Sequence, residues 1–400
     1  MSAADPGTAA RSPLRTVTAT RGVLYLLATS LIGRLPTAMA ALAIVQLVRL
    51  SGGDFALAGG MTAVYIVAGA VGQPLLSRLV DQRGRTVVIV LSTLISAAAF
   101  VAVATFATGL PALAAVGAAA AGFFAPPLEP SLRSLWPRLV PEGAPLKAAF
   151  SLDAGAQEIL FVVGPLLTVA GIGAFGATGN VVFAAVLGLV GGLAFAAHPL
   201  SRRTHLDERT DAPRESPWAR AAFRRVAAFA FAAGLPVGVL TIAATYVEES
   251  RALPGFSGWA LAVNALGALV GASLLALRPL RVDPRRAIAV CGLLLALGYL
   301  PLAFSLPAPV WLAGALISGL MLPPTLAQVF EVVAALSSPG SLTEANAWVV
   351  SAINVGIAAG TLGAGAVSSA HLHPVLLVAV GGALVLTAAS ALLVRRSGLS

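Results

Sequence analysis

The sequence predicts an all-α polytopic membrane protein, with twelve transmembrane helices in two six-helix pseudo-symmetric bundles. The first observation is composition: 58% of the 400 residues are hydrophobic, 10% are charged and the mean hydropathy is +0.92, whereas soluble domains carry roughly 25% charged residues. The second is that the apolar residues form continuous runs, which favour helices over a membrane β-barrel. The third is that basic residues alternate between the successive loops.

Twelve apolar runs are long enough to cross a bilayer, since a spanning helix needs about 20 mainly apolar residues. Proline, glycine and charged residues occupy the gaps, as expected for connecting loops. The predicted helices cover residues 22–48, 55–77, 86–107, 111–133, 147–170, 176–197, 223–248, 256–278, 286–305, 309–335, 344–369 and 374–394.

The basic residues predict an orientation, because cytoplasmic loops of membrane proteins are enriched in Lys and Arg. With a cytoplasmic N-terminus, 22 of the 25 basic residues lie in cytoplasmic segments. We therefore expect a multi-pass protein of the cell membrane (the inner or plasma membrane), with both termini cytoplasmic. The net charge of +9 then reflects topology, and no nucleic-acid partner is expected.

A polar, proline-containing stretch at 198–222 divides the apolar runs into two sets of six. We interpret this stretch as a cytoplasmic linker. The predicted organisation is a cytoplasmic N-terminal tail at 1–20, a six-helix bundle at 21–197, the linker, a second six-helix bundle at 223–395 and a C-terminal tail at 396–400.

The two sets of runs resemble each other. Similar residues recur at a nearly constant offset of 197 to 200 positions. The matching residues are Gly122 with Gly319, Pro126-Pro127 with Pro323-Pro324, Pro36 with Pro236, Gly72 with Gly271, and Gln157 with Asn354. Such a repeat predicts two halves with one architecture.

The segment Ser77–Arg85 separates the second and third runs. Its four charges in nine residues are too many for a bilayer core, so we predict a short loop on one membrane face. Leu79, Asp81, Gly84 and Arg85 match the loop between helices two and three of the major facilitator superfamily, which reads roughly Gly-x-Leu-(Ala/Gly)-Asp-Arg-x-Gly-Arg-(Lys/Arg), whereas Ser77 and Thr86 depart from it. Together with the helix count, topology and repeat, the chain resembles that superfamily from about residue 20 to residue 395.

This resemblance implies secondary transport by alternating access. Gly164-Pro165 in the fifth run is similar to a Gly-Pro pair in the antiporter motif of the bacterial 12-helix efflux-type branch. Leu160, Thr168 and Val169 replace glycines of that motif, and the arginine of the drug/proton antiporter motif in helix four is missing. The expected direction of transport, which depends on the Gly-Pro pair alone, is export.

Two charged residues, Arg34 in the first run and Glu158 in the fifth, are expected near the middle of the membrane. Charges there are costly, need partners and mark function by default. Because these helices are neighbours in the superfamily's fold, we predict that Arg34 pairs with Glu158 in a substrate or proton site. Asp153 is the second candidate proton carrier, and Gln157 belongs to the same predicted site. A permanent ion pair that only holds the helices together is the alternative.

A conformational gate is predicted at the cytoplasmic side. Glu129 and Arg133 are four residues apart and share a helix face, and with Asp153 they resemble the superfamily's inner charge network, which breaks and re-forms as the transporter switches. The loop contributes Arg78, Asp81, Gly84 and Arg85 to the predicted gate. We expect Asp81 and Arg85 to contact the second half around 342–344.

Prolines and isolated polar residues complete the candidates. Helix bends are predicted at Pro36, Pro126, Pro127, Gly164, Pro165, Pro323 and Pro324, with passive kinks as the alternative. Asn264, Gln328 and Asn354 are candidate substrate contacts in the second half, or hydrogen bonds between helices. Gln46 is expected to line the outer cavity, and Glu248-Glu249 to attract cations or face water.

The sequence and the resemblance together predict a secondary active transporter of a small amphipathic or anionic organic compound. Proton-coupled efflux through Glu158 is the expected reaction, and proton symport that imports a metabolite or nutrient is the alternative. Outside transport, the alternative is a membrane sensor or lipid-handling protein. We expect no enzyme activity, no cofactor and no metal site (His371 and His373 lack a third ligand). The expected partners of a monomer are protons, a small-molecule substrate and the lipid bilayer.

Overall fold

The structure, a computed structural model, describes residues 13–107, 109–202, 217–277, 284–304, 306–336 and 342–368. Every regular element in these ranges is a helix. The helices are α1 (Pro13–Ala19), α2 (Val23–Leu50), α3 (Phe55–Arg83), α4 (Arg85–Phe106), α5 (Pro111–Phe123), α6 (Leu128–Arg133), α7 (Trp136–Leu139), α8 (Ala144–Ala197), α9 (Pro199–Arg202), η1 (Pro217–Ala219), α10 (Ala221–Ser250), α11 (Phe256–Leu277), α12 (Pro284–Tyr299), η2 (Leu300–Ala303), α13 (Ala308–Leu336) and α14 (Leu342–Ser368).

Within the described ranges, nine helices are long and apolar enough to cross a membrane, and α12 is a shorter apolar helix. One of the nine, α8, contains two predicted runs, because Gly176 (φ 71°, ψ 174°) turns the chain between them in a conformation that favours glycine. The first eleven predicted runs thus correspond to described helices, and the predicted all-α polytopic fold is confirmed. The predicted twelfth helix, at 374–394, lies outside the described residues.

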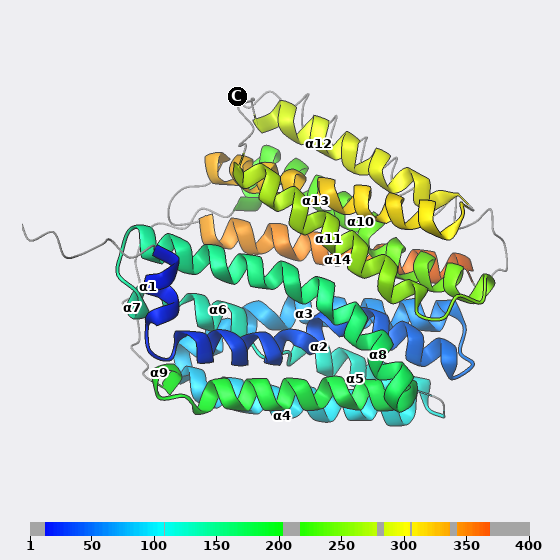
Figure 1. Ribbon diagram of the computed structural model, residues 1–400, viewed down its shortest axis with the longest axis horizontal. Coiled ribbons are helices and arrows are strands. Elements are labelled where there is room, and N and C mark those ends of the chain that lie inside the picture. Colours follow the sequence, from blue (N-terminus) through cyan, green and yellow to red (C-terminus); the bar gives the residue numbers. More distant parts are fainter. Residues whose placement is uncertain are drawn as a thin grey trace, which may run out of the picture.

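The helices form two groups that lie side by side with their axes roughly parallel (Figure 1). In the first group, α1 to α9, α2 packs against α8, α3 against α5, and α4 against both α5 and α8. In the second group, α10 to α14, α10 packs against α14, and α13 against α11 and α12. The groups meet where α3 contacts α14 and α8 contacts α11. The predicted linker contributes α9 and η1 at its two ends, and 203–216 lie outside the described residues.

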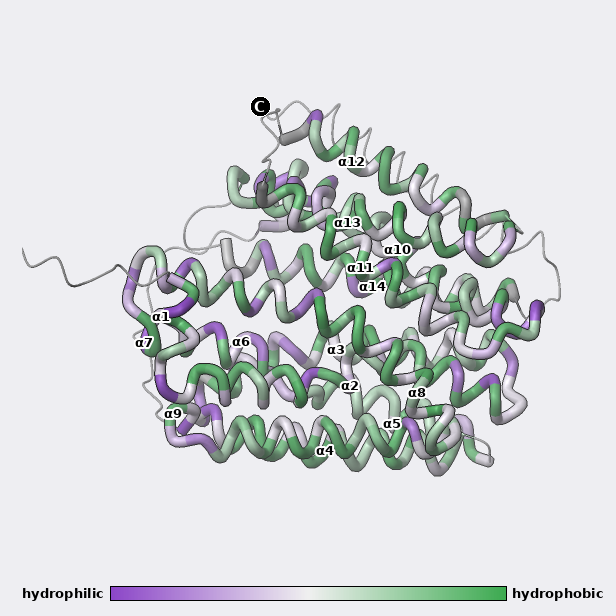
Figure 2. The backbone as a smooth tube through the Cα atoms, viewed as in Figure 1, coloured by the Kyte–Doolittle hydropathy of each residue, from purple (hydrophilic) through white to green (hydrophobic). Residues whose placement is uncertain are grey.

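The bundle has two distinct ends. We call the end with α1, α7 and α9 the basic end, because exposed arginines gather there, among them Arg15, Arg21, Arg138 and Arg202. The far end carries the turns at 51–54 and 251–255. Hydrophobic residues cover most of the helices, and hydrophilic residues gather near α1, α6, α7 and α9 (Figure 2). The basic end is the one that the sequence predicts to be cytoplasmic.

The sequence repeat appears again in the helix packing. A Cβ added to Gly122 would overlap the carbonyl oxygen of Tyr65, and one added to Gly319 would overlap that of Asn264. In the same way, a Cβ added to Gly72 would overlap the carbonyl oxygen of Phe123, and one added to Gly271 would overlap that of Leu320. The α3–α5 and α11–α13 pairs are therefore built alike, with backbones touching where small residues allow it.

The predicted proline bends differ from one helix to another. α5 ends at Phe123, residues 124–127 are not helical, and α6 restarts at Leu128, so Pro126-Pro127 interrupts the fourth run. Prolines cannot donate a backbone hydrogen bond, and here the Gln73 side chain binds the carbonyl oxygen of Ala125 at 2.7 Å. In contrast, α13 continues through Pro323-Pro324, α2 through Pro36 and α8 through Pro165.

Candidate functional site

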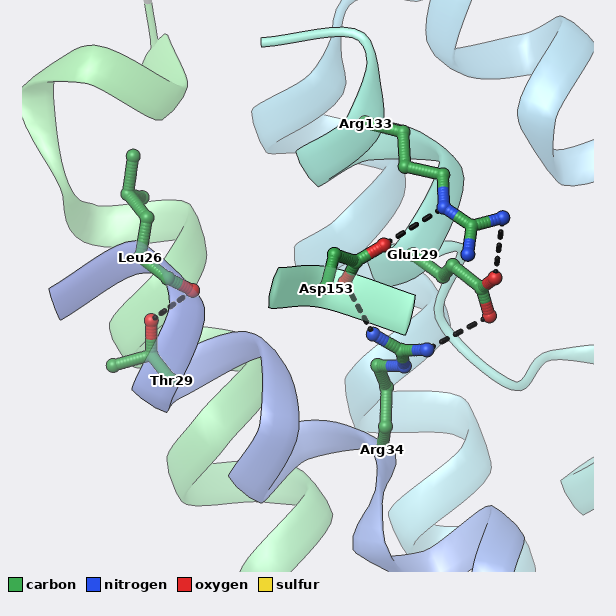
Figure 3. A network of polar contacts seen from close by, with 6 residues as sticks. All are labelled: Leu26, Thr29, Arg34, Glu129, Arg133 and Asp153. Atoms are coloured by element: carbon green, nitrogen blue, oxygen red, sulfur yellow. Dashed lines mark hydrogen bonds and ion pairs between the residues drawn. The ribbon is translucent and has the colours of Figure 1, made fainter. Parts of the chain in front are cut away.

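Four charged side chains from three helices form a closed ring inside the first group (Figure 3). The Arg34 guanidinium from α2 binds Glu129 of α6 at 2.9 Å and Asp153 of α8 at 3.2 Å. Arg133 of α6 binds the same two carboxylates, each at 2.7 Å. Positive and negative groups alternate around this ring, which we call the charge ring, so its four side chains have no net charge when all are ionised.

The charge ring has a buried edge and an exposed edge. The side chain of Asp153 is 0% exposed and that of Arg34 is 8% exposed. Glu129 and Arg133 are 34% and 43% exposed. Because a buried charge without a partner costs several kcal/mol, the ring pairing stabilises the buried edge, while Glu129 and Arg133 keep part of their surface exposed.

Local sequence explains why the charges converge. Gly33 lets α2 lie against Gly191 and Gly192 in the second span of α8, since a Cβ on Gly33 would be 2.9 Å from the nitrogen of Gly192. Arg34, the next residue around the helix, faces α6 and the first span of α8 instead. The break at 124–127 sets α6 apart from α5, and the four-residue spacing places Glu129 and Arg133 on one face of α6.

A small cavity inside the first group is lined in part by sequence neighbours of Arg34. Gly33 and Pro36, which flank Arg34, belong to its lining, as do Ala125 and Pro126 at the helix break. Its polar groups are the hydroxyls of Thr37, Tyr65, Thr93 and Ser96. The cavity thus lies in the interior of the first group, and the four charge-ring side chains are not part of its lining.

The predicted pairing of Arg34 with Glu158 is wrong. Among the described residues Arg34 pairs with Glu129 and Asp153, and Glu158 forms no ion pair. The reason is helical geometry: Asp153 and Glu158 are five residues apart, so they lie about 140° apart around α8. Only Asp153 faces Arg34, and Gln157, one turn further along, makes no hydrogen bond through its Oε1 in the described part of the chain.

The predicted loop at Ser77–Arg85 is wrong in its extent: Arg78 and Asp81 lie in α3, Arg85 begins α4, and only Gly84 lies between the two helices. Gly84, with φ 92° and ψ 143°, separates α3 from α4. Arg85 is buried and donates to the Ser201 carbonyl at 3.2 Å and the Ser134 hydroxyl at 2.9 Å, both within the first group rather than near 342–344. Arg78 is exposed. The Asp81 side chain and the side chains of 342–344 lie outside the described residues, so the Asp81 latch stays a prediction.

The polar candidates of the second group lie away from the charge ring. Asn264 donates to the Ala315 carbonyl at 3.0 Å and the Ser318 hydroxyl at 2.8 Å, so it joins α11 to α13. Gln328 is buried in α13, and its Oε1 has no hydrogen-bond partner in the described ranges. Asn354 is half-buried in α14.

The sequence analysis missed a polar link between the groups at the far end. Gln46 of α2 is buried and donates to Glu248 at 3.2 Å and to the Ser257 hydroxyl at 2.9 Å. Glu248 also accepts the backbone N–H of Gly255 at 3.0 Å and of Ser257 at 2.8 Å. It therefore holds the start of α11 rather than facing water.

A second far-end contact joins Arg49 to Glu249. The Arg49 Nε donates to Glu249 Oε1 at 2.8 Å, its Nη2 binds the other oxygen, and its guanidinium lies 3.9 Å above the Phe55 ring. The sequence carried a signal for this pair, because residues 49 and 249 are equivalent under the 200-residue offset. Equivalent ends of α2 and α10 thus carry opposite charges and meet.

Glycines also bring the two groups into contact at the far end. A Cβ on Gly59 would lie 3.2 Å from the Cα of Gly365. Because glycine has no Cβ, α3 can lie directly against α14 here. A Cβ on Gly258 would lie 3.0 Å from the Pro165 carbonyl oxygen, so the absence of a side chain at this position lets α11 lie against α8. The two groups are therefore held together at the far end by both polar and backbone contacts.

Comparison with known proteins identifies the family. Residues 24–276, more than half of the chain, match the family model of the Major Facilitator Superfamily.

The chain belongs to the Major Facilitator Superfamily.

This superfamily consists of transporters rather than enzymes, so the chain is a secondary transporter of small molecules and a multi-pass membrane protein. Within the part of the chain that the structure describes, no three His, Cys, Asp or Glu side chains gather as metal ligands would. The His371 and His373 pair lies outside that part.

Solved structures of several transporters share the fold. A variant of the nucleoside transporter NupG matches with a TM-score of 0.76 and 14% identity over 92% of this transporter and 98% of that chain. A bacterial homolog of the human lysosomal transporter Spinster, in an inward-facing and occupied conformation, matches with a TM-score of 0.74 and 15% identity over 94% and 96%. The human organic anion transporter MFSD10 (TETRAN) matches with a TM-score of 0.64 and 18% identity over 96% and 99%. No curated protein sequence matches significantly.

Proposed function

We propose that this transporter moves a small organic anion, or an amphipathic compound with an anionic group, together with protons, and that substrate and proton meet at the charge ring. One observation carries the proposal: Arg34 and Arg133 share two carboxylates in a ring with one accessible edge. The basic end would face the cytoplasm, as the distribution of basic residues predicts.

The composition of the charge ring links the proton to the anion. Arginine does not lose its proton in proteins, so Glu129 and Asp153 are the groups that exchange one. A proton on either carboxylate leaves the ring with one excess positive charge. A bound anion neutralises that charge, so a proton and an anion each favour the binding of the other.

Binding of both together favours movement of both in the same direction. Under an inward proton gradient this means import of the anion, the alternative that the sequence also predicts. Gly164-Pro165, the basis for expecting export, has a packing role as well, because a Cβ on Gly164 would lie 2.7 Å from that of Ala38 in α2.

Proton-driven export is the second candidate, and the resemblance of Gly164-Pro165 to the antiporter motif favours it. An antiporter needs substrate and proton to compete for the protein, whereas the charge ring favours both together. The two candidates therefore differ in the sign of the pH gradient that drives substrate uptake into vesicles.

Flux into proteoliposomes tests the proposal. Radiolabelled organic anions and amphipathic compounds are offered with the lumen either alkaline or acidic relative to the medium. We expect an alkaline lumen to drive accumulation and Asp153→Asn to abolish it, while Glu142→Gln, an exposed carboxylate in the α7–α8 turn, keeps the wild-type rate. Accumulation driven by an acidic lumen supports export. Unchanged pH-driven flux in Asp153→Asn contradicts the role of the charge ring.

A further inference from the structure

The two carboxylates of the charge ring hold the arginines in different ways. Glu129 places one oxygen on each guanidinium: Oε2 lies 2.9 Å from Arg34 Nη2, and Oε1 lies 2.7 Å from Arg133 Nη1. One planar carboxylate therefore bridges two arginines on the accessible side of the ring (Figure 3).

Asp153 holds the same arginines from the buried side. Its Oδ1 lies 3.2 Å from Arg34 Nη1, and its Oδ2 lies 2.7 Å from Arg133 Nε. Asp153 is fully buried in the continuous helix α8. Without Glu129, the two guanidiniums would still be oriented by Asp153, and Arg34 Nη2 and Arg133 Nη1, which Glu129 binds, would be open to another carboxylate.

We propose that Glu129 occupies the binding site of the substrate's carboxylate, and that a proton on Glu129 releases the site. This inference rests on the proposed function and names its substrate class, a monocarboxylate. The neutral Glu129 carboxyl leaves Arg34 and Arg133, and the carboxylate of the substrate bridges the same two nitrogens. One proton is bound for each carboxylate, no bond is formed or broken in the substrate, and the pair carries no net charge.

Its position makes Glu129 the carboxylate that moves. It lies in the six-residue helix α6, directly after the non-helical residues 124–127, and its side chain is 34% exposed. The charged groups facing it are Arg34 from α2 and Arg133 from α6 itself, with Asp153 of α8 behind them. From α3, the described contact with this break is the uncharged amide of Gln73.

Charge and shape together select a monocarboxylate. The bridge uses two oxygens of one planar group, which a substrate carboxylate reproduces. One proton on Glu129 compensates one negative charge. A dianion such as a phosphate monoester would leave the ring with an excess negative charge at a partly buried position, which is unfavourable.

Benzoate binding to the purified protein in lipid nanodiscs tests the inference. Benzoate stays ionised between about pH 5.5 and pH 8, so a change of its affinity in that range reports on the protein. For wild type we expect Kd to rise by up to about tenfold per pH unit, and benzoate binding in weakly buffered solution to take up about one proton per molecule bound. This proton count needs no variant.

Variants separate Glu129 from the other carboxylates. Glu129→Gln, which cannot be ionised, should bind benzoate at least about tenfold more tightly than wild type at about pH 8 and with little pH dependence. Arg133→Gln should lose measurable binding, and Glu142→Gln should behave as wild type. Size-exclusion profiles establish that each variant is folded.

The result that would overturn the inference is benzoate affinity independent of pH in wild type, without proton uptake. A Glu129→Gln variant that keeps the wild-type affinity and pH dependence would overturn it as well. If the proteoliposomes still show pH-driven flux that depends on Asp153, the proposed function stands and only the role of Glu129 as a substitute for the substrate's carboxylate is lost.

Discussion

The two helix groups share their packing and differ in their charge. Gly122 and Gly319 meet backbone carbonyls in the same way, at positions 197 residues apart. The charge ring has no such counterpart. Under the offsets of 200 and 197, the positions of Arg34, Glu129, Arg133 and Asp153 correspond to Gly234, Leu326, Phe330 and Val350.

This difference in charge changes how the helices pack at the equivalent positions of the two groups. In the second group, a Cβ on Gly234 would overlap the Ile353 carbonyl, so α10 lies directly against α14 there. In the first group, the equivalent position carries Arg34, whose guanidinium binds α6 and α8 through ion pairs. One architecture therefore tolerates either close apolar packing or a polar site at the same place, and only the first group uses it for charge.

The largest expected effect on stability is that of Arg34→Leu. Removing one partner leaves Asp153 buried beside a single arginine, which should lower the free energy of unfolding by about 3 to 5 kcal/mol and abolish pH-driven flux. Thermal unfolding in detergent measures the first effect and proteoliposome flux the second. A variant as stable as wild type would mean that the ring contributes nothing to the fold.

Gly122→Ala and Gly319→Ala should have smaller and similar effects. Each new Cβ would overlap a backbone carbonyl, and such overpacking costs about 1 to 3 kcal/mol. Gly155→Ala in the first group and Gly363→Ala in the second are controls, because a Cβ at either meets nothing within 4 Å. Strongly unequal losses at Gly122 and Gly319 would contradict the equivalence of the two helix pairs.

Replacing the whole ring should cost less than breaking it. The combined variant Arg34→Ala, Glu129→Leu, Arg133→Phe and Asp153→Val gives the first group the apolar character of the second. Because apolar replacement of a buried ion network is often neutral, its stability should lie within about 1 kcal/mol of wild type, with no pH-driven flux. A loss larger than that of Arg34→Leu would show that the ring is required for folding itself.

The smallest expected effect on stability is that of Arg49→Leu at the far end. The Arg49 and Glu249 side chains are partly exposed, 23% and 34%, and such pairs contribute about 0 to 1 kcal/mol. The far end should nevertheless open more often. Spin labels on Ser51→Cys and Ser250→Cys, in a Cys291→Ala background, should show a larger population of long distances. An unchanged distance distribution would assign the closure of this end to the glycine contacts alone.

Prediction from sequence succeeded where the signal is local or periodic. Apolar runs predicted the spans, because each span must satisfy its own backbone hydrogen bonds in lipid. The constant offset predicted which glycines occupy equivalent helix crossings, and the spacing of Glu129 and Arg133 predicted their contact within α6. The Gly122 and Gly319 contacts confirm the repeat in particular atoms rather than in helix count alone.

Prediction failed where the partner depends on rotation around a helix. The fifth run offers two acids, Asp153 and Glu158, and the pairing of Arg34 with Asp153 follows from the face that α8 turns toward α2. Gln46 and Glu248 meet only because the ends of α2 and α10 converge across the two groups.

The sequence by itself thus determined the fold class, the spans and the repeat, because hydrophobicity and offset are properties of the chain alone. Only the tertiary structure decided which charges meet: the break at 124–127 moves α6 against α2, and the rotation of α8 then brings Asp153 to close the ring. Ion pairs within a bundle depend on distances of about 3 Å, which helix boundaries and periodicity do not specify.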